Sequence, residues 1–281
     1  MPFTIQLLKI FTIIIGFNKY YIDNFSYKLY NLCMKNSRLT FNSSTNFTLP
    51  IGVYQVLQRD AYYYGFMKSE KPNVSGFLNN LIPALSDYQE DLFGELLKYN
   101  NGNEEIAKTC ARSIHNVYLR PFAFHDDGVV NVPFRISKEK YDDFIVIHDE
   151  RLAFYDTDFT NYVRTLLSEY ASKTLGQREY LYAFRMINDI REAICKRKLC
   201  KFYIDEQTAV FVPVSVETSP VYNHNFVVGI DSSGQTYAVR LSEIRKISVT
   251  SNKLKITKEI CELISDYLDK IYEEEYNECS Y

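Results

Sequence analysis

The sequence predicts a mixed α+β protein with a mostly helical first part, a module of short β-strands after it, and a helix at the end. Three observations favour this fold class. A short alternating strand followed by two helix-like runs occurs twice between residues 46 and 167. Five short runs rich in β-branched and aromatic residues follow between residues 201 and 249. A last run, residues 260–275, has apolar residues at helical spacing. With 281 residues, 46% of them hydrophobic, the chain is long enough for about two domains with cores of their own.

The first 33 residues contain an apolar stretch, Thr4–Phe17, that Lys9 interrupts. Its uncharged part is shorter than the roughly 18 residues that span a bilayer, and no small-residue cleavage pattern follows it. Met34 begins a stretch typical of a natural start. We therefore expect residues 1–33 to be a leader without a targeting role, either a mis-assigned start or an extra helix, and we expect no membrane segment.

The two copies of the strand-helix-helix plan occupy residues 46–82 and 133–167. Phe47 and Leu49 alternate with polar residues in the first copy, and Phe134 and Ile136 do so in the second. A single unit of this kind cannot bury its apolar face, but two units can pair their strands and interlock their helices. We therefore predict that the strand around Phe47 pairs antiparallel with the strand around Phe134, with the four apolar side chains on one face.

This plan resembles the ribbon-helix-helix family, which builds the unit from two chains and presents the paired strands to nucleic acid. The resemblance implies that residues 34–175 form a tandem ribbon-helix-helix-like domain within one chain. On the predicted ribbon the outward residues are Asn46, Thr48, Arg135 and Ser137. They include only one charged residue, so readout of duplex DNA by this ribbon is the alternative function and not the preferred one.

Further helices are predicted around the copies. In each copy a hydroxyl residue, Ser75 or Thr160, is the predicted cap of the second helix. Between the copies, residues 87–99 have helical spacing, and another helix runs from residue 104 to about residue 119 with Asn103 as its N-cap. His125–Gly128 is predicted to be a plain turn and not a metal or catalytic site. Residues 176–200 are predicted to form a connecting helix.

The strand module, residues 201–250, is predicted to form a small antiparallel barrel because five short strands follow one another with turn residues between them. The strands are expected at residues 201–204, 209–216, 225–230, 236–241 and 244–249. Residues 251–281 are a predicted C-terminal helical extension. Its apolar stripe consists of Ile260, Leu263, Ile264, Leu268 and Ile271. Because this stripe must be buried, we predict that the helix or the barrel joins two copies into a homodimer.

Three segments of the strand module resemble the WYL domain, a small Sm-like barrel common in bacterial regulators. They are Pro213 near the end of the second strand, Asn225-Phe226-Val227-Val228-Gly229, and Val239-Arg240-Leu241-Ser242-Glu243-Ile244. The resemblance implies that Phe226 and Arg240 line a surface for nucleic acid or a nucleotide-like ligand. Glu243 stands where the family has a second arginine, and Arg245 and Lys246 supply positive charge nearby.

Charge is unevenly distributed along the second part of the chain. Residues 190–256 hold ten Lys or Arg and six Asp or Glu, a balance of +4, whereas residues 257–281 hold two and eight, a balance of −6. Positive charges with aromatic rings between them are typical of single-stranded nucleic-acid binding. The candidate binding residues of this module are Lys196, Arg197, Lys198, Lys201, Tyr203, Phe226, Tyr237, Arg240, Arg245 and Lys246.

These patterns predict a nucleic-acid-binding regulatory protein and not an enzyme, since no phosphate loop, His-Glu metal motif or nucleophile elbow occurs. The six cysteines are scattered without metal-ligand spacing, which favours reduced thiols in a cytoplasmic protein and predicts no cofactor. The order of the parts resembles the WYL accessory family of type VI-D CRISPR-Cas systems. That resemblance implies a dimer that binds single-stranded RNA and raises the activity of an RNA-guided ribonuclease. The alternative is a DNA-binding WYL-domain repressor that responds to a ligand.

Overall fold

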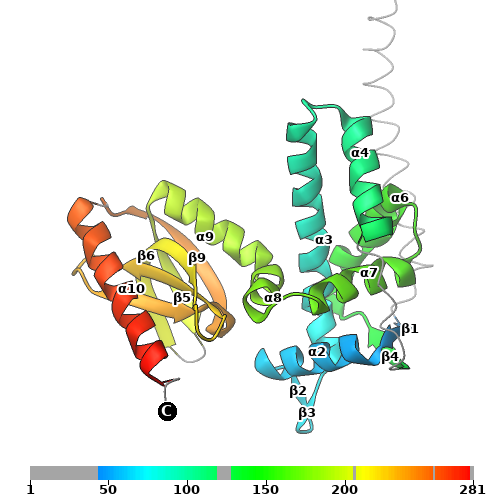
Figure 1. Ribbon diagram of the computed structural model, residues 1–281, viewed down its shortest axis with the longest axis horizontal. Helices are drawn as coiled ribbons and strands as arrows, with labels where there is room; N and C mark the ends of the chain where they lie inside the picture. The colour runs from blue at the N-terminus through cyan, green and yellow to red at the C-terminus, as the bar shows by residue number, and fades with distance from the viewer. Residues whose placement is uncertain (1–43, 119–127, 205–206, 256, 279–281) are drawn as a thin grey trace, which may run out of the picture. The chain divides into compact units, whose positions relative to one another are not determined.

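The computed structural model describes residues 44–118, 128–204, 207–255 and 257–278, all within one compact unit, Ser44–Tyr281. This unit combines helices with a five-stranded antiparallel sheet, so the predicted mixed α+β class is confirmed (Figure 1). The predicted leader, residues 1–33, and most of the predicted turn at residues 125–128 lie outside the described residues.

The predicted strand pair of the first part is confirmed. Strands β1 (Ser44–Pro50) and β4 (Val129–Arg135) pair antiparallel, with Phe47 opposite Val132. The side chains predicted to face inward are buried, and the rings of Phe47 and Phe134 lie 6.0 Å apart. Residues that alternate with them in both strands are exposed, so the ribbon has one apolar and one polar face.

After β1, the chain forms a helix, a hairpin and a long second helix. The elements are α2 (Ile51–Tyr63), β2 (Met67–Lys68), β3 (Lys71–Pro72) and α3 (Val74–Tyr99). The cap of α3 is Asn73 and not the predicted Ser75, because Asn73 Oδ1 accepts from the backbone N–H of Gly76 at 3.0 Å. The helix predicted at residues 87–99 is the second half of α3.

The next helix, α4 (Glu104–Ser113), is capped by Asn103 as predicted and continues into a π-helical turn, η1 (Ile114–Tyr118). After β4 the first helical run of the second copy is divided into short pieces. They are η2 (Lys138–Lys140), α5 (Tyr141–Val146), η3 (Ile147–Arg151) and α6 (Leu152–Tyr155). The following helix, α7 (Phe159–Ala171), is capped by Asp158 and not by the predicted Thr160.

A histidine is buried in the core of the first part. His115 of η1 is 2% exposed, and its ring centroid lies 4.5 Å from that of Tyr155 and 5.1 Å from that of Tyr162. A hydrogen bond of 3.1 Å joins its Nδ1 to Gln89 Nε2, while its Nε2 has no partner among the described residues. Burial lowers the pKa of His115 to about 4, so the ring is neutral in the folded protein at pH 7.

The folded protein should therefore lose stability in mild acid. The unfolded chain binds a proton at His115 near the usual pKa of about 6.5, whereas the folded chain binds it only near 4. Stability from this residue is complete above pH 6.5 and falls as the pH drops toward 4, by about 2 kcal/mol at pH 5. Urea unfolding at pH 7.5 and pH 5 measures this loss, and His115→Phe should reduce it by that amount. His148→Gln, at an exposed position, is the control; equal losses in the protein with and without His115 would contradict the assignment.

The predicted connecting helix is two helices. They are α8 (Leu175–Tyr182) and α9 (Phe184–Lys196), and the chain bends between them at Ala183, where ψ is 13°. A capping box formed by Thr174 and Gln177 starts α8.

The strand module forms an open sheet. Its strands are β5 (Lys198–Ile204), β6 (Gln207–Thr218), β7 (Asn225–Ile230), β8 (Thr236–Arg240) and β9 (Ile244–Lys253). They lie in the order β8-β7-β6-β5-β9, and each neighbouring pair is antiparallel. Because β8 and β9 end this order without pairing to each other, the predicted barrel is not closed by these strands.

Helices pack on both faces of the sheet, and both faces of β7 are covered. Ile187, Ile190 and Ala193 of α9 pack with Phe202 and Phe211 on one face. Helix α10 (Lys258–Glu278) lies across the sheet (Figure 1), and its Ile264 packs with Phe226, Val228 and Ile230 on the other face. Every residue of β7 is consequently buried.

Helix α10 packs against the sheet of its own chain, which buries most of the apolar stripe from which we predicted a homodimer. Ile260, Leu268 and Ile271 of the predicted stripe pack against the sheet together with Ile264, while Leu263 is 50% exposed. Except for Leu263, the stripe is covered without a second copy, and the homodimer stays a prediction that rests on the resemblance alone. No helix among the described residues is long and apolar enough to cross a membrane.

Polar contacts also hold the far end of α10. Ser219 Oγ, in the β6–β7 connection, donates to Glu275 Oε2 at 2.6 Å, and Tyr222 Oη donates to Glu278 Oε2 at 3.0 Å. Glu275 is 9% exposed and also lies 3.8 Å from His224 Nε2. The last turns of α10 are therefore fixed to the sheet module by hydrogen bonds as well as by apolar packing.

Candidate nucleic-acid interface

On one face of β5 and β9, an aromatic ring lies close to two lysines. Because Cys200 and Phe202 point into the core toward α9, strand alternation puts Lys201 and Tyr203 on the other face. Lys246 of β9 is the cross-strand partner of Tyr203. The Nζ atoms of Lys201 and Lys246 lie 4.9 Å and 5.9 Å from the centroid of the Tyr203 ring. We call these three residues the Tyr203 patch.

Short side chains surround the patch on the neighbouring strands. Thr208 of β6 lies opposite Tyr203, and Val210, which is 42% exposed, lies opposite Lys201. On β9, Ser248 is the partner of Lys201. Thr208, Val210 and Ser248 are not among the predicted residues, although side-chain alternation within β6 and within β9 carries the signal that would find them.

A second group of cations lies where α9 passes into β5. Lys198 is opposite Lys253 in the register of β5 and β9, and the exposed Arg197 precedes it in a left-handed conformation with φ of 52°. Lys196 is exposed too, but its ammonium group lies 2.5 Å from Glu192 Oε1, which offsets its charge. The structure thus adds Lys253, which sequence reasoning missed, to the predicted residues Arg197 and Lys198.

Phe226 does not offer its ring to a ligand, which corrects the prediction that it lines the binding surface. The side chain is 3% exposed because α10 covers it, and its ring contacts Tyr272 of α10 with centroids 6.3 Å apart. A base cannot stack on Phe226 in this arrangement, and Phe226 is a core residue.

Tyr237 and Arg240 do not belong to one surface with Lys201. The ring of Tyr237 stacks on Phe211 in the core toward α9, with centroids 5.1 Å apart and planes 5° apart. Arg240 is exposed at the end of β8, where it lies opposite Phe226. Strands β7 and β6 separate it from Lys201 on β5. The predicted grouping of Arg240 with Tyr237, Phe226 and Lys201 is therefore wrong.

Arg245 and Lys246 are adjacent in β9 and so leave the strand on opposite sides. Lys246 belongs to the Tyr203 patch, whereas Arg245 lines a pocket that it shares with Tyr182 and Ser242. The two residues that were predicted to supply positive charge near Glu243 therefore lie at two different sites, Lys246 in the Tyr203 patch and Arg245 in this pocket.

The ribbon of β1 and β4 presents the other predicted residues. Asn46, Thr48 and Arg135 are exposed on its polar face, and Asn131, which was not predicted, lies opposite Thr48. The backbone of Arg135 is fixed by α3, since its carbonyl accepts from Asn79 Nδ2 at 2.9 Å. This face carries a single charged side chain.

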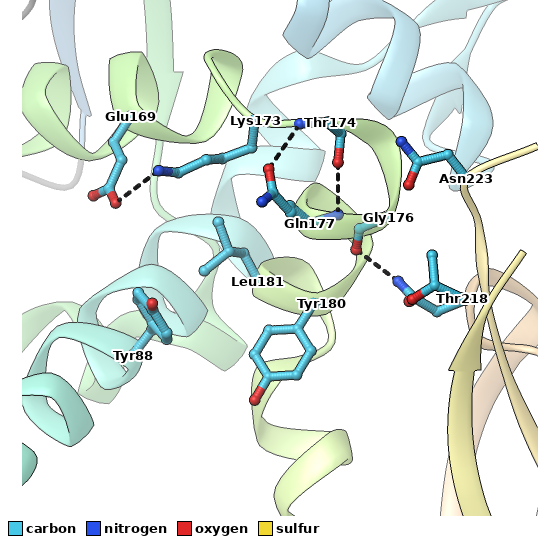
Figure 2. A pocket seen from close by; sticks show the side chains of 11 residues that line it. Tyr88, Glu169, Lys173, Thr174, Gly176, Gln177, Tyr180, Leu181, Thr218 and Asn223 are labelled. Carbon is cyan, nitrogen blue, oxygen red and sulfur yellow. Dashed lines mark hydrogen bonds and ion pairs between the residues drawn. The ribbon is translucent and has the colours of Figure 1, made fainter. Parts of the chain in front are cut away.

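A polar pocket of about 310 Å³ lies at the start of α8 (Figure 2). Lys173 Nζ lies 3.6 Å from Glu169 Oε1 at one end of it, and Asn225 Nδ2 donates to the carbonyl of Gly176 at 2.6 Å near the other. These groups satisfy each other, and none of the predicted binding residues lines the pocket. We interpret it as part of the joint between the helices and the sheet.

A buried carboxylate completes this joint. Glu179 of α8 is 0% exposed, and its carboxylate accepts hydrogen bonds from both sides of the joint. Tyr63 Oη of α2 donates to its Oε1 at 2.7 Å, and the backbone N–H and Nδ2 of Asn225 in β7 donate to its Oε2 at 2.5 Å and 3.2 Å. Burial raises the pKa of Glu179. One side chain therefore connects α2, α8 and β7.

No family model matches the sequence, and no curated protein matches it either. Among solved structures, the chain is similar to one described as the crystal structure of a CRISPR Cas-related protein, with a TM-score of 0.52 and 15% sequence identity. The match covers 77% of this chain and 64% of that one, so this chain spans a little under two thirds of the length of its structural neighbour. At this identity the likeness shows a shared fold.

Proposed function

We propose that this protein binds single-stranded RNA through the Tyr203 patch and serves as an accessory protein of an RNA-guided CRISPR ribonuclease. The observation that carries the RNA proposal is the half-buried Tyr203 ring with the ammonium groups of Lys201 and Lys246 4.9 Å and 5.9 Å from its centroid. A partly exposed ring can stack on a base of any sequence, and cations beside it can hold the flanking phosphates. Arg197, Lys198 and Lys253 extend the positive charge toward one end of the same strands.

The CRISPR part of the proposal has two supports. One is the structural neighbour that is described as CRISPR Cas-related. The other is the resemblance of the order of parts to the WYL accessory family, with a tandem ribbon-helix-helix-like region, residues 34–175, before a WYL module. In this proposal the protein is not itself an enzyme, acts in the cytoplasm, and acts as a homodimer.

Duplex DNA binding by the β1–β4 ribbon is the second candidate. Its support is the polar face with Asn46, Thr48, Asn131 and Arg135 exposed on two paired strands, a shape that fits a major groove. One cation gives this face little attraction for phosphates. The Tyr203 patch and its neighbouring cations therefore favour single-stranded RNA.

Tyr203→Ala should weaken binding of single-stranded RNA by roughly 5- to 150-fold, the loss of one base stacked on an aromatic ring. Lys201→Ala and Lys246→Ala should each flatten the log-log salt dependence by about 0.7, the value for one phosphate contact on a single strand. Fluorescence anisotropy with unstructured RNA at several salt concentrations measures both effects. Tyr99→Ala, which removes a tyrosine that is 83% exposed at the end of α3, is the matched control and should bind as the parent does.

The same variants test the CRISPR role. Added to the RNA-guided ribonuclease of its own genome, the parent protein should raise the rate of RNA cleavage, and Tyr203→Ala should raise it less. If Tyr203→Ala binds RNA normally while Arg135→Ala abolishes binding to duplex DNA, the repressor function is the better account.

A further inference from the structure

A hydroxyl residue of β9, Ser248, borders the Tyr203 patch. In the register of β9 with β5, Lys246 lies opposite Tyr203. Two residues further along β9, Ser248 lies opposite Lys201. Neighbouring strands are about 5 Å apart, and two residues along a strand cover roughly 7 Å. The four residues therefore mark the corners of a rectangle, with the two lysines on one diagonal and Tyr203 and Ser248 on the other.

All four side chains are on one face of the sheet. Phe202 of β5 and its partner Ile247 of β9 pack into the core toward α9. Because side chains alternate along a strand, the residues on either side of this pair point to the other face. The register of β9 with β5 is regular from Lys246 to Val249, so the alternation holds across the whole rectangle.

The charged and hydroxyl groups of these residues are available to a ligand. Within the part of the chain that the structure describes, Lys201 and Lys246 form no ion pair and the hydroxyl of the half-buried Ser248 makes no hydrogen bond. The next hydroxyl of β9 differs in this respect, since Thr250 Oγ1 donates to the carbonyl of Leu199 at 2.8 Å. Ser248 can therefore bind a group of a ligand that the two lysines hold.

A nucleotide of single-stranded RNA matches this arrangement. Its sugar joins two phosphates, and its base and its 2′-hydroxyl are on opposite faces of the ribose ring. If the two phosphates lie on the lysine diagonal and the base lies on Tyr203, the 2′-hydroxyl is directed toward Ser248. A serine hydroxyl can both donate to and accept from this group, which is the one that lets a protein tell RNA from DNA.

We propose that Ser248 selects ribose over deoxyribose at the Tyr203 patch. This inference rests on the proposed RNA binding and adds the group that makes the site prefer RNA to single-stranded DNA. One hydrogen bond of this kind gives a preference of about 2- to 12-fold. Thr208 of β6 also has a hydroxyl on this face, opposite Tyr203. Only Ser248 neighbours both lysines, one across the strands and one along its own strand.

Fluorescence anisotropy with labelled oligouridine and with oligodeoxyuridine of the same length tests the proposal, because the two strands differ only at the 2′ position. The full chain should bind oligouridine more tightly by that factor. Ser248→Ala should weaken the binding of oligouridine alone and so bring the two Kd values together. Ser248→Thr, which retains a hydroxyl, should keep the preference. Ser251→Ala, at an exposed serine of the same strand, is the matched control and should bind as the parent does.

Other outcomes separate this inference from the RNA site itself. If the parent binds the two strands equally and Tyr203→Ala weakens both, the selection by Ser248 is wrong and the nucleic-acid site remains. A preference that survives in Ser248→Ala would overturn the inference too, and its loss in Thr208→Val would then place the sugar over β6. Failure of the parent to bind either strand would overturn both proposals.

Discussion

Replacing Asp60 with alanine should lower the free energy of unfolding by about 3–5 kcal/mol. Asp60 of α2 is 2% exposed, and its carboxylate accepts from Arg178 Nε at 2.7 Å and from Arg178 Nη2 at 3.1 Å. Tyr170 Oη of α7 donates to the same carboxylate at 2.7 Å. Removal of the acid leaves a guanidinium and a phenol in the core without their acceptor, and an uncompensated buried charge is the costly part.

Urea unfolding at pH 7 measures this loss. The double variant Asp60→Leu with Arg178→Met should recover most of it, because both charges are then removed together and apolar contacts replace the ion pair. Asp189→Ala, at an exposed position on α9, is the control and should change stability by less than about 0.5 kcal/mol. A loss below about 1 kcal/mol in Asp60→Ala would show that the carboxylate does not hold α2, α7 and α8 together.

Gly229→Ala should destabilise the protein by about 3 kcal/mol or more. A Cβ atom at this position in β7 would lie 2.3 Å from Phe211 Cδ2 and 2.3 Å from the carbonyl oxygen of Val212. The ring of Phe211 cannot move aside easily, since it stacks on Phe202 at 4.3 Å and on Tyr237 at 5.1 Å. Overpacking of a core typically costs 1–3 kcal/mol, and here the backbone of β6 is in the way as well.

Gly94→Ala is the matched control for that substitution. Gly94 lies inside α3, and apart from the backbone of its own helix turn no atom lies within 4 Å of an added Cβ, so alanine should stabilise the helix by about 0.5–1 kcal/mol. Thermal unfolding of both variants gives changes of opposite sign if the sheet is packed as described. A melting temperature of Gly229→Ala equal to that of the parent would contradict the packing of Phe211 against β7.

The strands could be predicted from sequence because their alternation and turn residues are local properties. The burial of the second face of the sheet could not be predicted in this way, because the helix that covers it, α10, is some thirty residues beyond β7 in the chain. The resemblance to the WYL domain implies that Phe226 lines a surface, and α10 covers it instead. The nearly unbroken apolar run of Phe226–Ile230 is in fact typical of a strand covered on both faces, and it was the available signal.

Closure of the sheet and the grouping of its cations depend on pairing between distant strands. Periodicity gives the face of each residue within a strand but not which strands become neighbours, so Arg240 and Lys201 were grouped although two strands separate them. Lys246 and Tyr203 come together only through the register of β9 with β5. The alternation of side chains along a strand was enough to predict that Arg245 and Lys246 lie on opposite faces, because adjacent residues of a strand point to opposite sides of the sheet.

The cover that α10 gives to β7 determines how this protein can be divided for experiments. A chain ended at residue 250, the sequence-predicted end of the strand module, would expose Phe226, Val228 and Ile230 to water as one contiguous apolar surface. Exposed apolar surfaces of this kind promote aggregation, and a fragment that carries one binds other molecules non-specifically. Fragments used to map ligand binding therefore need to extend through Glu278, where the last hydrogen bond to the β6–β7 connection is made.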